Sequence, residues 1–188
     1  MNELALYILD LTQNSVTAGA TCVEIRVTID READSLLIEI IDDGCGMSPE
    51  FVAKVTSPFT TTRKTRKVGL GIPMIKQLCE MCEGVFKIES EAGKGTRLHL
   101  QFRLSHVDLP PMGDLAQTMT ALVIGSPDKP DFRLVYTEGA EPYEFDTAAI
   151  RQILGDDVPL NTPDVVMWMQ ADLQEGLEAA ARPGNAEN

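Results

Sequence analysis

The sequence predicts an α+β protein, in which helices lie on one face of a mixed β-sheet and form a two-layer sandwich with it. Two patterns support this fold class. Several segments alternate apolar and polar residues, as strands with one buried face do, and others repeat apolar residues at helical spacing. These two kinds of segment are interleaved along the chain. The 188 residues, of which 44% are hydrophobic, suffice for a substantial core.

The first predicted helix runs from Glu3 to about Val16, because Leu4, Ile8 and Leu11 recur at helical spacing. Alternating apolar residues predict the strands, and glycines or polar residues mark the turns between them. The expected strands are 23–29, 36–41, 85–90 and 97–104, and the further helices are 47–55 and 69–82.

The composition changes after residue 104, and Pro110 and Pro111 suggest a boundary there. We therefore expect a first domain over residues 1–104 and an acidic, mostly helical α/β extension over residues 105–188. Within the extension, periodicity predicts helices near 115–124, 147–154 and 164–180, with a hairpin across 132–145.

The charge of the chain is −13, from 16 Lys and Arg against 29 Asp and Glu. Residues 1–106 contain 12 basic and 14 acidic side chains, whereas residues 107–188 contain 4 basic and 15 acidic ones. Net acidity opposes general attraction to polyanions, so we expect neither a nucleic-acid nor a membrane partner. The N-terminal MNEL lacks the positive charge of a secretory signal, and no apolar run approaches bilayer length. The expected location is cytoplasmic.

Four motifs follow one another in the first domain: LTQNSVTAGA at a helix end, DDGCG after a strand, VGLGIP before a helix and GKGT in a hairpin turn. In this order and on these elements they resemble the ATP-binding domain that histidine kinases, gyrases, mismatch-repair proteins and Hsp-type chaperones share, the GHKL or Bergerat fold. NSVTAGA is most similar to the mismatch-repair branch. The segment from Gly69 to Phe102 is more similar to a histidine-kinase catalytic domain.

The resemblance implies an adenine-binding role for the segment around Asp42. A carboxylate at this strand end can accept a hydrogen bond from the adenine 6-amino group, whereas guanine presents a carbonyl there. Gly44 and Gly46 would let the backbone approach the base, and Thr96 resembles the family threonine that supports the same contact through water.

Asn14 resembles the family ligand for Mg²⁺, because its amide oxygen is a hard donor of the kind that this ion requires. Asp10 lies one helical turn earlier on the same face. In the hydrolysing members a Glu at this offset activates water, and Asp is one methylene shorter. Asp10 is therefore either a catalytic base or a partner of Asn14 and its Mg²⁺.

Four positive charges lie within five residues, Arg63 to Lys67, just before the glycine segment. They form either a solvated loop or an ATP lid whose cations neutralise phosphate oxygens. In the second case Lys67 contacts a phosphate, and the backbone amides of Gly69, Leu70 and Gly71 add donors at a helix N-terminus. Kinase relatives usually have a further glycine where Lys67 stands.

Two other features are better explained without chemistry. Cys79 and Cys82 form a CxxC on a predicted helix, but no second ligand pair accompanies them, so packing is favoured over zinc. His106 follows a strand and precedes Val107, unlike a kinase phosphoacceptor, so autophosphorylation there is not expected.

Three functional hypotheses follow from the resemblance. In the first, a signalling protein binds Mg·ATP and transfers phosphate to a histidine or serine of a separate protein. In the second, nucleotide gates a clamp that forms a homodimer or captures a partner, with slow ATP hydrolysis. In the third, a non-catalytic adaptor senses nucleotide and binds its partner through residues 105–188.

Overall fold

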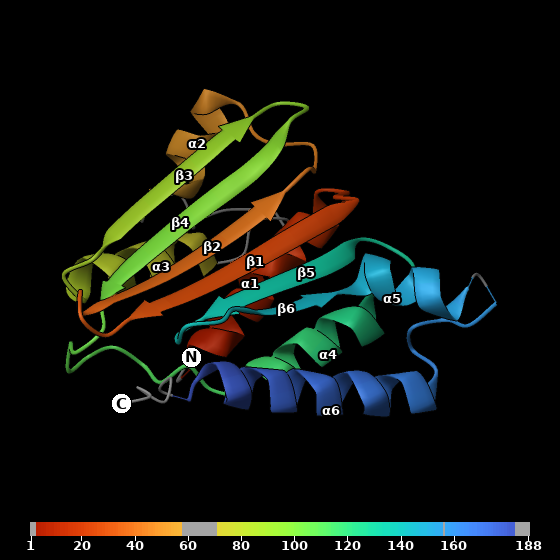
Figure 1. The fold of residues 1–188 in the computed structure, drawn as a ribbon. Helices are drawn as coiled ribbons and strands as arrows, with labels where there is room; N and C mark the ends of the chain where they lie inside the picture. Colours follow the sequence, from red (N-terminus) through yellow and green to blue (C-terminus); the bar gives the residue numbers. More distant parts are fainter. Residues whose placement is uncertain (1–2, 58–70, 156, 183–188) are drawn as a thin grey trace.

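The computed structural model describes residues 3–57, 71–155 and 157–182. Its centre is one six-stranded sheet with the strand order β3-β4-β2-β1-β5-β6 (Figure 1). The strands are β1 (Cys22–Asp30), β2 (Ser35–Asp42), β3 (Val85–Glu91), β4 (Gly95–Arg103), β5 (Asp131–Thr137) and β6 (Tyr143–Asp146). The helices are α1 (Leu4–Thr17), α2 (Pro49–Val55), α3 (Gly71–Met81), α4 (Leu115–Gly125), α5 (Thr147–Leu154) and α6 (Pro163–Ala180).

The sheet is mixed, as the sequence predicts. β1 pairs with β2, β2 with β4, β3 with β4 and β5 with β6 in antiparallel fashion, whereas β5 pairs with β1 in parallel. The connection from β4 to β5, which includes α4, returns the chain to the end of the sheet at which β4 began. β5 can therefore run parallel to β1. The α+β fold class is thus confirmed.

The strands bury alternate residues because one face of the sheet carries the helices. On β2 the inward residues Leu36, Ile38 and Ile40 are at most 2% exposed. Figure 1 shows α1 and α3 behind the sheet, with α4 and α6 below them. Of the helices in the described part of the chain, none combines the length and the apolarity that crossing a bilayer would demand.

The extension is built into the sheet rather than attached to it. It supplies β5 and β6, and β5 lies directly beside β1. It also satisfies the first turn of α1, because the backbone amides of Leu4 and Ala5 donate to the carbonyls of Pro111 and Met112 at 2.9 and 2.8 Å. The boundary at residue 104 stays a prediction, and the hydrogen-bonded sheet crosses it without interruption.

Truncating Met119 to alanine tests whether the extension shares one core with the first domain. Met119 is fully buried on α4, which packs against α1. We expect Met119→Ala to lower the free energy of unfolding by about 2–5 kcal/mol. Urea denaturation should give one transition, coincident by far-UV circular dichroism and by the fluorescence of the single tryptophan, Trp168. The exposed Gln117→Ala on the same helix is the control. Two separate transitions would contradict a shared core.

Candidate nucleotide-binding site

A pocket of about 220 Å³ opens where α1, α2, the start of α3 and the ends of β2 and β4 converge. Four of the predicted site residues line it together, and they come from different parts of the chain: Asn14, Asp42, Gly46 and Thr96. The pocket therefore joins all four sequence motifs, which lie far apart in the sequence, because Ile72 of VGLGIP also lines it. Its remaining walls are largely apolar.

Asp42 is held in one orientation by two donors. The Ser15 hydroxyl donates to Oδ2 at 2.6 Å, and the Gly44 backbone amide donates to Oδ1 at 2.9 Å. Ser15 is nearly buried on α1, so the link ties the helix to the end of β2. A carboxylate fixed at a pocket wall can select a ligand that offers it a hydrogen-bond donor. Sequence reasoning missed Ser15, although it follows the predicted Asn14 directly.

Two glycines allow the loop after β2 and the turn before β4 to approach each other closely. Gly46 has a φ of 62°, and a Cβ added there would lie 1.9 Å from the Glu91 carbonyl oxygen. Gly95 has a φ of 102°, and its Cβ would lie 2.0 Å from the Asp42 carbonyl oxygen. Any side chain at either position would push the two loops apart. Gly44 is packed against Ala18 and so limits the other side of the loop.

Thr96 lies opposite Asp42 in the β2–β4 pair. Its hydroxyl is 2.9 Å from the Ser90 hydroxyl, which also accepts from the Met47 backbone amide at 2.9 Å and reaches the Gly95 carbonyl at 3.0 Å. All three contacts are satisfied if the Ser90 hydroxyl donates its one proton to the Gly95 carbonyl and accepts from both the Met47 amide and the Thr96 hydroxyl. This leaves acceptor capacity on Thr96 for water at the pocket.

Asp43 has a structural role beside the pocket. The Thr21 hydroxyl and the backbone amides of Thr21 and Cys22 all donate to its carboxylate. Burial alone would raise the pKa of Asp43, but these hydrogen bonds outweigh burial and lower it. Asp43 thus fastens the loop after β2 to the beginning of β1.

The surroundings of Asn14 fit a Mg²⁺ ion that a nucleotide brings with it. Its side chain lines the pocket, and no side-chain hydrogen bond within the described ranges occupies its amide. No group of three or more His, Cys, Asp or Glu residues in the described part of the chain could hold a metal by itself. A single amide oxygen suits Mg²⁺, which keeps several waters and takes phosphate oxygens as further ligands.

Asp10 points to the beginning of α3 rather than to the pocket wall. A Cβ added to Gly71 would lie 2.1 Å from Asp10 Oδ2, so the carboxylate sits against the backbone of Gly71. This contact joins α1 to the helix that the glycine motif opens. A catalytic role of Asp10 stays a prediction. Three other predicted contacts, Lys67, Gly69 and Leu70, lie outside the described residues, as does the rest of the segment from Arg63.

The apolar walls of the pocket include four residues that sequence reasoning did not assign to a site: Met47, Phe51, Ile72 and Leu98. Phe51 is 39% exposed on α2, and Met47 is half-buried in the loop before it. Apolar walls with a few fixed polar groups are typical of pockets for planar ligands. The only sequence signal that marks them is their position: Ile72 lies within VGLGIP, and the other three lie shortly after DDGCG or GKGT.

The CxxC is part of the core. Cys79 and Cys82 are both 0% exposed, and neither forms a disulfide. Burial raises the pKa of the Cys79 thiol to about 12, so it is not a thiolate at neutral pH. Packing is therefore the role that the structure gives to this motif.

The chain is thus an α+β domain with a pocket at one end of its sheet. The chain belongs to the family described as histidine kinase-, DNA gyrase B-, and HSP90-like ATPase, whose sequence profile matches residues 2–106. The match covers the same part of the chain as the four motifs, so the GHKL resemblance is confirmed.

Curated relatives are sensor proteins and kinases. A putative sensor protein of Shewanella frigidimarina is 32% identical over 108 residues, which cover 56% of this chain and 16% of the relative. A putative NtrY-like sensor histidine kinase of Rickettsia felis is 28% identical over 109 residues, 58% of this chain and 18% of that one. Sporulation kinase E of Bacillus subtilis is 33% identical over 100 residues, which cover 53% of this chain and 13% of that kinase. The matched region thus spans less than a fifth of each of these relatives.

Among solved structures, the chain is similar to the MutL ATPase domain of Aquifex aeolicus complexed with ADP. The sequence identity is 18% and the TM-score is 0.47, over 72% of this chain and 60% of that one.

Replacing Asp42 with asparagine should weaken ATP binding by about 100-fold, because a charge-assisted hydrogen bond is lost and an amide donor faces the base. Ser15→Ala should weaken binding by a smaller factor of about 5–10, because it removes only one of the two donors that orient Asp42. Isothermal titration calorimetry measures both. Glu32→Gln, in the exposed turn between β1 and β2, is the control for charge removal. Unchanged affinity of Asp42→Asn would refute the adenine contact.

Cys45 offers a direct probe of pocket occupancy, since it is exposed and lines the pocket. Bound ATP should slow alkylation of Cys45 by N-ethylmaleimide by about 10-fold or more, because ligand covers the thiol. Cys22 is an internal control: it is exposed and lies outside the pocket. Burial and the nearby Asp43 raise its pKa, so it should react slowly with or without ATP. Peptide mass spectrometry gives each rate. Equal Cys45 rates with and without ATP would contradict this site.

Proposed function

We propose that this protein binds Mg·ATP in the pocket beside Asp42 and transfers the γ-phosphoryl group to a separate protein. The observation that carries the proposal is the fixed Asp42 carboxylate, which shares a pocket with Asn14, whose amide forms no side-chain hydrogen bond within the described ranges. Membership of an ATPase family and similarity to sensor kinases support the nucleotide and the reaction class.

Asp42 would accept a hydrogen bond from the adenine 6-amino group. Its second oxygen is already fixed by Ser15, so the carboxylate cannot turn away to suit another base. Guanine would place a carbonyl oxygen against this carboxylate and leave both acceptors unpaired. Unpaired buried polar groups reject a wrong ligand strongly. The pocket should therefore prefer ATP to GTP.

Asn14 would hold Mg²⁺ at the phosphate end of the nucleotide. The ion supplies neutralisation of the charge on the phosphate oxygens. The side chain itself would contribute one oxygen ligand from a defined place, because Asn14 stands in the last turn of α1, next to Ser15 and its bond to Asp42. Helix α1 therefore presents the phosphate-binding group and, through Ser15, orients the base-binding carboxylate at the end of β2.

A second candidate function is an ATP-gated clamp with slow hydrolysis. The observation that favours it is the contact between Asp10 and Gly71, which links the helix of Asn14 to the beginning of α3. A carboxylate at this junction would move with any rearrangement of the glycine segment. In this case Asp10 would activate water, and the γ-phosphate would leave as inorganic phosphate.

Labelled ATP distinguishes the two functions. With γ-³²P-ATP and Mg²⁺, phosphoryl transfer requires that label appear on a protein that copurifies with this chain, and the clamp requires its release as inorganic phosphate. Asn14→Ala should lower either rate by about 100-fold or more, whereas its exposed neighbour Gln13→Ala should not. Asp10→Asn should stop release and spare transfer. Label that stays on the nucleotide in the presence of those proteins would refute both.

A further inference from the structure

A second concave surface lies in the extension, away from the nucleotide pocket. It is a groove of about 520 Å³ between the beginning of α4, the C-terminal half of α6 and the N-terminus of α1. Met112, Leu115 and Leu177 give it apolar walls. Figure 1 shows α4 and α6 side by side, running in opposite directions.

The rim of the groove is acidic. Glu3, Asp114 and Glu178 line it, and no Lys or Arg does. Asp114 accepts a hydrogen bond from the Gln117 amide at 2.8 Å and so caps α4. Neither Glu3 nor Glu178 takes part in an ion pair within the described ranges. Helix α6 as a whole contains four acidic residues and no basic one. The rim of the groove thus carries two carboxylates that form no ion pair in the described part of the chain.

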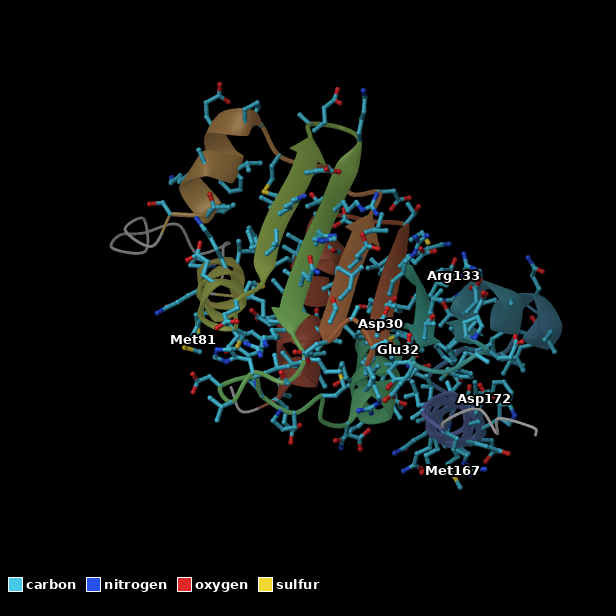
Figure 2. The ribbon with its side chains drawn as sticks, turned by 60° about the vertical axis from the view of Figure 1, so that its left-hand side comes forward. Asp30, Glu32, Met81, Arg133, Met167 and Asp172 are labelled. Atoms are coloured by element: carbon cyan, nitrogen blue, oxygen red, sulfur yellow. The ribbon has the colours of Figure 1, made fainter. Side chains whose placement is uncertain are left out.

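One stripe of α6 extends this surface away from the acidic end. Met167, Gln174 and Glu178 stand at i, i+7 and i+11, so they share one helix face. Met167 is 70% exposed, and Figure 2 shows its side chain directed away from the body of the protein, on the opposite side of α6 from Asp172. Ile124, at the end of α4 that faces this part of α6, is 47% exposed. The surface is acidic at one end and apolar at the other.

We propose that this groove is a docking site for an amphipathic helical segment of a partner protein. Its Lys or Arg residues would meet Glu3 and Glu178, and its apolar face would lie on the half-buried Met112 and Leu177 and continue toward Met167. The charge of the groove selects this occupant, because cations neutralise both rim carboxylates and apolar side chains fill the walls. Glu178 and Met167 are about 16 Å apart along α6, which is about three turns of a bound helix.

Other occupants fit this surface less well. A second copy that placed the same face on itself would bring Glu3 and Glu178 against like charges, and α6 has no cation to offset them. Nucleic acids and anionic membranes would meet the same repulsion. The docking surface requires no nucleotide, so it is independent of the function proposed above.

The test uses the full chain without nucleotide and a fluorescein-labelled, 18-residue Leu/Lys peptide with all leucines on one helix face. Fluorescence anisotropy gives its affinity. Glu178→Lys should weaken binding by about fivefold or more, while Glu175→Lys should weaken it by less than about twofold. Both variants change the net charge equally on exposed positions of α6, but only Glu178 lines the groove. Met167→Ser should also weaken binding, without changing its dependence on salt.

A peptide of the same composition with its leucines spread around the helix is the control for amphipathicity, and it should bind at least about fivefold more weakly. Equal losses from Glu175→Lys and Glu178→Lys would overturn the proposal, because attraction would then come from overall acidity. So would failure of the amphipathic peptide to bind, or equal binding of the two peptides. Circular dichroism of each variant verifies its fold before binding is compared.

Discussion

The close approach of the ends of β2 and β4 is the constraint on which the site depends. Gly95 packs its Cα against the carbonyl of Asp42, while Gly46 packs against the carbonyl of Glu91, and neither position has room for a side chain. This proximity places Thr96 beside Asp42 and lets Ser90 bond to both Thr96 and the Met47 amide. The turn geometry therefore determines where the carboxylate stands, and Ser15 determines only which way it faces. A substitution at either glycine would displace several polar groups at once, which no change of a single contact could do.

Helix α1 connects this site to the rest of the protein. Its last turn carries Asn14 and Ser15, and its first amides are satisfied by Pro111 and Met112 of the extension. Unpaired amides at a helix start cost free energy when they are buried, so the extension contributes to the helix that positions the site. β5 contributes in the same way through its parallel pairing with β1. For this reason removal of residues 105–188 is not a neutral deletion, and the adaptor hypothesis cannot be tested by truncation alone.

Local patterns in the sequence were sufficient for most elements, including α1, whose bounds differ by one residue from the predicted ones. They also marked Asn14, Asp42, Gly46 and Thr96, because these residues belong to motifs with a recognisable order. What could not be predicted depends on pairing between distant segments. Alternation shows that β5 is a strand but not that it lies beside β1, since any half-buried strand has the same pattern. Ser15 and Ser90 were missed for a related reason: a serine acquires its role only from the partner that the fold brings to it.

The distribution of charge allows the chain to attract opposite ligands at two places. Glu3 and Asn14 both belong to the region of α1, eleven residues apart, which is about 16 Å along a helix. At physiological ionic strength the Debye length is about 8 Å, so the acidic groove is largely screened from the nucleotide pocket. The net charge of −13 is therefore a poor guide to either site. Phosphates respond to the nearly neutral first part of the chain, whereas a cationic partner responds to the carboxylates around α6. Had the acidic residues been spread evenly over both parts, the phosphates would have met a repulsive field and the cationic partner a weaker attraction.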